Sequence, residues 1–142
     1  MRKVVFVFFI LLLCSSFNPY TSRSITINFE IASTEINEEG KKDLRSVAEF
    51  LKAYTKVKVQ LEGHTDQTET KNEEEAMELS INRAQVCKDY IIQQLKNIPK
   101  IEERILIKGY GYDQLSVPET VKGELLKKNR EINRRVEIRV TR

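Results

Sequence analysis

Asp66 and Arg83 are the residues of this 142-residue chain whose types and spacing most clearly suggest chemistry. Asp66 comes at the end of a predicted strand, and Arg83 lies well inside the predicted helix that follows. One polar loop joins the two elements, so we expect a carboxylate and a guanidinium to face each other across that loop. Such a pair suits a ligand that carries both an ammonium and a carboxylate, because each ligand charge then meets its opposite.

Arg83 also allows a structural interpretation. It precedes Cys87 by about one helical turn and therefore borders the apolar stripe of its helix, where an unpaired arginine would be costly. An ion pair with Glu78 or Asp89 on the same helix would satisfy its charge without any ligand. Spacing alone does not decide between a binding site and such an ion pair.

The residues around Asp66 also suggest two kinds of enzyme site. Glu62, His64 and Asp66 would share one side of an extended strand, and carboxylate and imidazole are ordinary zinc ligands. His64 is the only histidine, however, and no HExxH motif or nearby cysteine pair accompanies it. Ser80 lacks a histidine at suitable local spacing for a serine hydrolase, although His64 could approach it in the fold. We therefore expect no metal, no cofactor and no enzymatic activity, and a hydrogen-bonding role for His64.

Periodicity predicts the elements that must position these side chains. Apolar and polar residues alternate near residues 25–29, 57–64, 105–108 and 133–140, which predicts strands. Apolar residues recur at helical spacing in the segments that follow Asn37 and Asn72. The order strand, helix, strand, helix, strand, loop, strand predicts an α/β two-layer sandwich, with a mixed sheet and two main helices on one face.

The helix boundaries have clear signals. Asn37 and Asn72 each precede consecutive glutamates, which is typical of helix N-caps, and Glu75 stands at the capping-box position relative to Asn72. Pro99 is expected to end the second helix. Cys87 falls within the apolar stripe of that helix, so we expect a small buried hydrophobe and not a reactive thiol.

The last strand is expected to have an inner and an outer side. Residues 115–128 before it are polar and irregular, which predicts a surface loop. Within the strand, apolar residues should face inward and charged residues outward, as Val136, Ile138 and Val140 alternate with Arg135, Glu137 and Arg139.

The N-terminus is typical of a bacterial export signal. Arg2 and Lys3 precede an apolar run over residues 4–13, which is shorter than the ~20 residues that a transmembrane helix needs. The chain is 40% hydrophobic and carries a net charge of only +3, so we expect a single domain and no nucleic-acid partner. The expected organisation is a signal peptide over residues 1–16, a short tether over 17–24 and one domain over 25–142.

The signal could be processed in two ways, because Cys14 is a candidate for lipidation. It directly follows the apolar run, where a lipoprotein signal places the cysteine that is acylated, and this would give the protein a lipid anchor in the membrane. Leu13 departs from the small residue that usually precedes such a cysteine. Lipidation of Cys14 and ordinary cleavage after Ser16 both stay open.

Several separated motifs resemble the OmpA-like peptidoglycan-binding domain, of the type found in the C-terminal part of OmpA and MotB and in peptidoglycan-associated lipoproteins. The resemblance spans nearly all of residues 25–141. It rests on an opening strand that ends at Phe29, on EGHTD at 62–66, on LS at 79–80 with RA at 83–84, on GYG at 109–111 and on NRRVE at 133–137.

The resemblance implies a function and a site. Members of this family bind the diaminopimelate of the peptidoglycan stem peptide through the residues that match Asp66 and Arg83. Thr65 is implied to add hydrogen bonds, and Arg134 to line the same groove. The implied protein is non-catalytic, binds peptidoglycan, and tethers membrane to cell wall on the periplasmic side of the envelope, in association with the outer membrane.

The loop between the two charges departs from the family pattern. Residues 67–70 supply no glycine, and the loop is longer than is usual in the family. Ala76 stands where the family often has an asparagine, which leaves Asn72 as the nearest candidate replacement. Glu69 and the glutamates at 73–75 add negative charge beside Asp66, which favours a ligand's ammonium and weakens the hold on its carboxylate. These changes motivate the alternative that the fold is a protein-interaction or assembly module of the envelope without wall binding.

Overall fold

The computed structural model describes residues 24–141. The predicted signal peptide, most of the tether and Cys14 lie outside the described residues. The elements in chain order are β1 (Ile25–Asn28), α1 (Glu38–Ala53), β2 (Lys58–Gly63), α2 (Glu73–Gln94), the short 3-10 helix η1 (Ile101–Arg104), β3 (Ile105–Gly109), α3 (Gly123–Asn133) and β4 (Arg135–Thr141).

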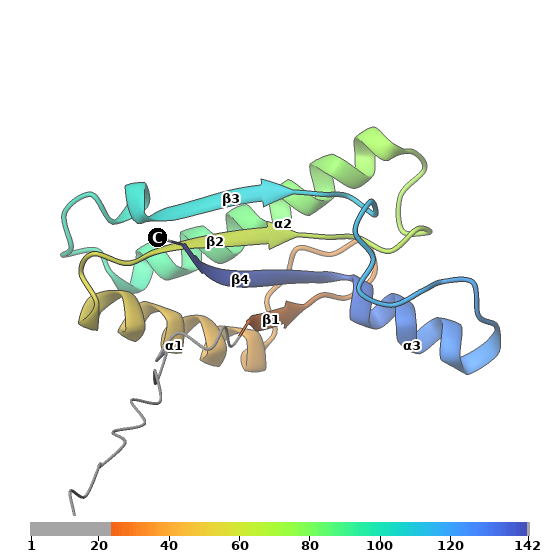
Figure 1. The fold of residues 1–142 in the computed structure, drawn as a ribbon, viewed down its shortest axis with the longest axis horizontal. Coiled ribbons are helices and arrows are strands. Elements are labelled where there is room, and N and C mark those ends of the chain that lie inside the picture. Colours follow the sequence, from red (N-terminus) through yellow and green to blue (C-terminus); the bar gives the residue numbers. More distant parts are fainter. Residues whose placement is uncertain (1–23, 142) are drawn as a thin grey trace, which may run out of the picture.

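The four strands form one mixed sheet in the order β1-β4-β2-β3. β4 runs antiparallel to both of its neighbours, whereas β2 and β3 are parallel. Figure 1 shows α1 and α2 lying together behind one face of the sheet, while α3 lies beyond one end. The predicted mixed sheet with two helices on one face is confirmed, and a third helix is added to it.

The core lies between the sheet and these two helices. The predicted stripe of α1 is buried, and Cys87 of α2 is fully buried among apolar side chains. Burial raises the pKa of the Cys87 thiol to about 12, so it stays protonated and packs as a small hydrophobe. No helix among residues 24–141 is long and apolar enough to cross a membrane.

α3 replaces part of the surface loop predicted for residues 115–128. This prediction was wrong because polar bonds anchor the helix, and no apolar stripe marks it. Asn133 is fully buried and bonds the preceding segment through Ser116 N, Val117 N and Val117 O. Asn129 donates to the Pro118 carbonyl oxygen at 2.6 Å. Hydrophobic periodicity gives no signal for a helix held in this way.

Two residues of β4 differ from the predicted burial, although Arg135 and Glu137 share one face of the strand and Val136 and Ile138 face the core. Arg135, expected outside, is buried, because its guanidinium bonds Glu137 and the backbone oxygens of Asn133 and Gln114. Val140, expected inside, is 47% exposed. β1 pairs β4 only from Arg135 to Ile138, so Val140 has a neighbouring strand on one side alone.

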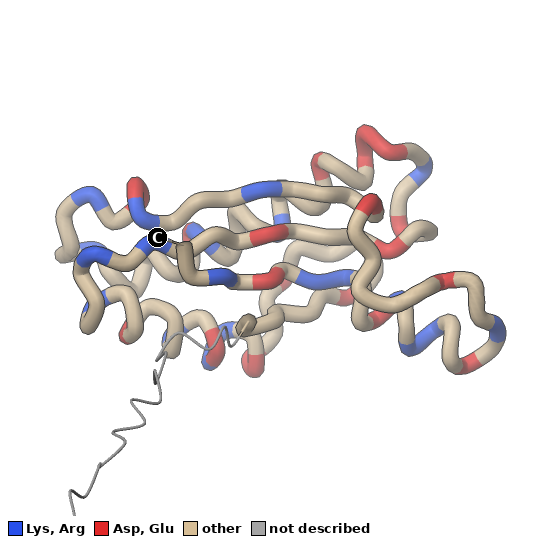
Figure 2. Tube along the Cα trace, in the orientation of Figure 1, with Lys and Arg blue, Asp and Glu red and all other residues tan. Residues whose placement is uncertain are grey.

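Charged residues of both signs are interspersed along the elements of residues 24–141. Figure 2 shows blue and red segments alternating along the strands, with acidic residues gathered at the amino end of α2. This distribution agrees with the small net charge of the chain.

Gly63 brings the end of β2 close to α2 and thereby sets the position of the residues that follow. A Cβ at this position would overlap the backbone oxygen of Ser80. We predict that Gly63→Ala lowers the free energy of unfolding by about 3 kcal/mol, because either β2 or α2 must shift. Gly123→Ala is the control, since nothing lies within 4 Å of that Cβ although φ is +65°. Denaturant unfolding measures both, and equal losses would contradict this role of Gly63.

Candidate functional site

Four charged residues form a buried network where β2 ends against α2 and the start of β4. We call Asp66, Glu69, Arg83 and Arg134 the charge network. Arg83 pairs with Glu69 at 2.7 Å, and Arg134 pairs with Asp66 at 2.9 Å. The side chain of every member is at most 5% exposed. Two positive and two negative charges are thus held together almost without solvent.

Asp66 is the first residue of the predicted clamp, and both of its carboxylate oxygens have partners. Oδ1 accepts hydrogen bonds from Thr68 N, Thr68 Oγ1 and Glu69 N at 2.6 to 3.0 Å. Oδ2 accepts from Arg134 Nη1 at 2.9 Å. Burial by itself would raise the pKa of Asp66, but the hydrogen bonds from Thr68 and Arg134 outweigh it and hold the pKa below its ordinary value.

Arg83 is fully buried, and each of its five N–H groups has an acceptor. Nε donates to the Ser33 carbonyl oxygen, Nη1 to the carbonyl oxygen of His64, and Nη2 to that of Glu30, at 2.9 to 3.1 Å. The remaining two N–H groups bond Glu69 in a bidentate fork, both at 2.7 Å. The guanidinium also lies over the Phe29 ring, 5.1 Å from its centroid.

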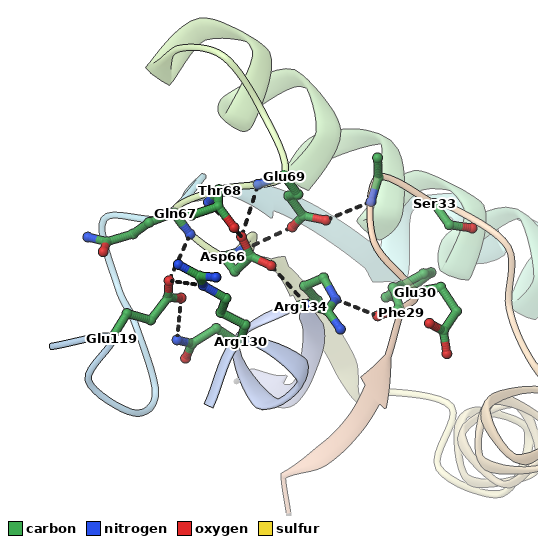
Figure 3. A network of polar contacts seen from close by, with 12 residues as sticks. Phe29, Glu30, Ser33, Asp66, Gln67, Thr68, Glu69, Glu119, Arg130 and Arg134 are labelled. Atoms are coloured by element: carbon green, nitrogen blue, oxygen red, sulfur yellow. Dashed lines mark hydrogen bonds and ion pairs between the residues drawn. The ribbon is translucent and has the colours of Figure 1, made fainter. Parts of the chain in front are cut away.

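Glu69 therefore takes the place in which a ligand carboxylate was expected. Its two oxygens accept from the fork of Arg83 and also from Ala32 N at 2.9 Å and Asp66 N at 3.0 Å. Figure 3 shows the Glu69 carboxylate beside Asp66, directed at the segment that carries Ser33. The expectation that Asp66 and Arg83 would face each other directly is corrected, because Glu69 lies between them and bonds both.

The structural partners suggested for Arg83 were also wrong. Glu78 and Asp89 lie on α2 beside it, whereas the observed partner, Glu69, lies in the loop before the helix. Sequence reasoning noted the negative charge of Glu69 without assigning it a partner. The available signal was an acidic residue in the loop stretch where the family expects glycine.

The other predicted site residues lie around the charge network in different roles. Thr65 is fully buried, and its N–H donates to the Gly111 carbonyl oxygen at 2.8 Å. Asn72 is exposed and caps α2 by accepting from Glu75 N at 2.9 Å. Glu75 completes a variant of the capping box, because its carboxylate accepts from Lys71 N and not from Asn72 N. The structure thus uses Asn72 as a cap, at the edge of the loop.

His64 and Ser80 have surroundings that do not resemble a catalytic pair. The Ser80 hydroxyl donates to the Met77 carbonyl oxygen and accepts from Gly111 N. His64 stacks on Tyr110, with ring centroids 5.3 Å apart. Within residues 24–141, neither ring nitrogen of His64 has a hydrogen-bond partner, so the predicted hydrogen-bonding role is not seen there. No group of His, Cys, Asp and Glu in that range is arranged to hold a metal ion.

A further buried carboxylate beside the loop, Glu119, has no signal in the sequence. Glu119 is 1% exposed at its side chain and bonds Arg130 at 3.3 Å and Asn133 Nδ2 at 2.8 Å. It also accepts from Gln67 N, the residue that follows Asp66. Figure 3 shows Glu119 and Arg130 beside Gln67, so α3 and the segment before it support the loop.

Comparisons with known proteins agree on one family and one fold. A model of the OmpA family matches residues 28–137, and no curated protein sequence matches the chain. The chain is 31% identical to an outer membrane protein from Borrelia burgdorferi B31, over 85% of this chain and 88% of that one, with a TM-score of 0.58. It is 25% identical to the C-terminal domain of Helicobacter pylori MotB, over 83% and 84%, with a TM-score of 0.67. A peptidoglycan-associated lipoprotein from Burkholderia pseudomallei shares the fold at 16% identity, over 82% and 89%, with a TM-score of 0.68.

The burial of His64 predicts a pH-dependent stability. Burial and the nearby guanidinium groups of Arg135 and Arg139 lower its pKa from 6.5 to about 4, against the opposing charge of Glu137. Between these pH values His64 is protonated in the unfolded chain and neutral in the folded chain. The free energy of unfolding therefore decreases as the pH falls from about 6.5 to about 4. The full loss is roughly 3 kcal/mol.

His64→Phe keeps a ring against Tyr110 and cannot titrate, so it isolates this effect. Denaturant unfolding at several pH values should show a shallower loss of stability for the variant than for the wild type within that window. The lowered pKa of Asp66 acts below its ordinary value of 3.8 and therefore does not account for the difference. Parallel pH profiles for the two proteins would contradict the assignment to His64.

Proposed function

Because the chain belongs to the OmpA family, we propose that it is a non-catalytic protein of the cell envelope that binds peptidoglycan through the diaminopimelate of the stem peptide. The observation that carries the proposal is the buried charge network at the end of β2, which contains the two residues that match the family's ligand-binding pair. Asp66 and Arg83 both occupy the site where the family's motifs converge.

The chemistry of the ligand fits these two residues. The side chain of diaminopimelate ends in a centre with one ammonium and one carboxylate. The Asp66 carboxylate is suited to the ammonium, and the guanidinium fork of Arg83 is suited to the carboxylate. A lysine at the same position of the stem peptide has the ammonium alone, so only diaminopimelate uses both residues.

Binding in this site is an exchange of partners. Every N–H group of Arg83 already has an acceptor, and both oxygens of Asp66 already have donors. A ligand therefore gains only the difference between its own contacts and the internal contacts that it replaces. We expect a modest affinity for free muropeptides, with tight attachment to the wall arising from many copies on one sacculus.

The same proposal places the protein on the periplasmic side of the envelope, associated with the outer membrane. An export signal over residues 1–16 would take it there, and a lipid on Cys14 would anchor it to the membrane. Residues 17–24 would then act as a short tether to the domain at 25–142. Mass spectrometry of the mature N-terminus distinguishes an acylated Cys14 from cleavage after Ser16.

The second candidate function is an assembly module of the envelope that uses the same fold to bind another protein. The observation that favours it is the internal pairing of both ligand-binding charges, which removes them from the surface. Pull-down with purified sacculi separates the two functions. Retention on sacculi supports wall binding, whereas a protein partner bound without any sacculus retention supports the assembly module.

Conservative variants test the proposed clamp, since Asp66→Asn keeps the shape of the side chain and Arg83→Lys keeps its positive charge. Asp66→Asn is expected to weaken binding of both diaminopimelate and lysine muropeptides by about tenfold or more, because both ligands present an ammonium. Arg83→Lys is expected to weaken binding of the diaminopimelate form alone, since only that ligand has the second carboxylate. Calorimetric titration of the wild type and both variants with each muropeptide measures the dissociation constants.

Lys58→Ala serves as the control for these variants, since it removes an exposed charge at the opposite end of β2. It should leave both affinities unchanged. Circular dichroism verifies that each variant is folded. Unchanged affinities in Asp66→Asn and in Arg83→Lys, with the fold intact, would refute the clamp.

A further inference from the structure

The Glu69 carboxylate is bound as a ligand carboxylate would be. It forms a bidentate pair with Arg83, receives further N–H donors from Ala32 and Asp66, and has no exposed side-chain surface. Charge-assisted bidentate pairs of this kind are among the strongest hydrogen-bonded contacts in proteins. The guanidinium fork is therefore an occupied carboxylate site, and its occupant belongs to the chain itself.

Ala32 shows that the surrounding backbone is shaped around this carboxylate. Its φ is 49°, in the left-handed region that an alanine adopts at a cost. Its N–H group points at Glu69 Oε2 at 2.9 Å. The connection from β1 to α1 thus supplies a donor to Glu69 as well as two carbonyl acceptors to Arg83.

Two carboxylates cannot bond the guanidinium fork of Arg83 at once. The charge network holds two guanidinium groups and two carboxylates, and the fork has no N–H group left over. A ligand carboxylate added to the occupied fork would place a third buried anion beside Asp66 and Glu69, which is costly. Glu69 must leave before a ligand carboxylate binds.

Glu69 is placed so that it can leave. It lies in the loop between β2 and α2, outside both elements, and the preceding Gln67 and Thr68 are exposed. Withdrawal of its side chain breaks no bond of the sheet ladder and none within α2. Arg83, in contrast, is fixed by three backbone oxygens that do not depend on Glu69.

We propose that Glu69 is an intramolecular carboxylate ligand of Arg83, which competes with the carboxylate of an external ligand and so sets both affinity and specificity. The ligand assignment rests on the proposed function, whereas the occupied carboxylate site does not. Only molecules in which Glu69 has left Arg83 can bind the carboxylate of diaminopimelate. The apparent affinity is therefore proportional to the fraction of such molecules. A ligand with an ammonium alone does not compete with Glu69, so its affinity is not reduced. Glu69 therefore decreases the ratio of the affinity for diaminopimelate to the affinity for lysine.

Removal of the Glu69 side chain should leave a carboxylate site that a small anion fills. Glu69→Ala is expected to be less stable than the wild type, and sodium acetate should raise its thermal midpoint by about 4 °C or more beyond the effect of equal sodium chloride. The wild type should respond to the two salts alike. Glu74→Ala, which removes an exposed charge from the first turn of α2, is the matched control and should also respond alike.

A second variant locates the acetate effect. Glu69→Ala combined with Arg83→Met removes the guanidinium, so the response to acetate should disappear. If Glu69→Ala does not fold in chloride, acetate should restore the folded fraction seen by circular dichroism. Equal responses of Glu69→Ala to acetate and chloride, or an acetate effect that survives Arg83→Met, would overturn the inference.

Muropeptide titration of the Glu69→Ala variant then tests specificity. Its affinity for the diaminopimelate form should rise by about tenfold relative to the wild type, with little change for the lysine form. An unchanged ratio of the two affinities would refute the specificity role. Acetate rescue without any muropeptide or sacculus binding would instead uphold the occupied site and refute the proposed function, so the two failures are distinguishable.

Discussion

The site depends on one buried network of opposite charges, made by Asp66, Glu69, Arg83 and Arg134. The unfavourable desolvation of these buried charges is offset because each of them has an oppositely charged partner and further hydrogen bonds. The network joins the segment after β1, the end of β2, α2 and the start of β4, which are far apart in the sequence. It therefore holds the loop in place, and any ligand that uses the same charges must do so by exchange.

Local periodicity was sufficient to predict most of the fold. The strands, α1, α2 and the caps at Asn37 and Asn72 follow from patterns that extend over only a few residues. α3 was missed because the side chains that anchor it, such as Asn133, bond residues 16 or 17 positions away. The burial of Arg135 was missed because its guanidinium, on the same face of β4 as Glu137, bonds backbone acceptors outside its strand.

The sequence predicted which residues lie together at the candidate site better than it predicted which of them form ion pairs. The family motifs predicted Asp66, Thr65, Arg83 and Arg134 as site residues, and the structure brings all four together near the end of β2. Which acid meets which arginine depends on contacts such as that between Arg134 and Asp66, 68 residues apart, and spacing within one element carries no information about them. The role of Glu69 is a product of the rebuilt loop, so the family resemblance did not reveal it.

Nuclear magnetic resonance during titration with a diaminopimelate muropeptide shows whether the charge network binds the stem peptide. The Arg83 Nε–H signal reports on the guanidinium itself, and the amide signals of Asp66, Thr68 and Glu69 report on the loop. If the charge network binds the stem peptide, these signals shift together and saturate with one dissociation constant, while the signals of α1 stay unchanged. Saturable shifts confined to another surface, or no shifts at ligand concentrations where the protein binds sacculi, would contradict it.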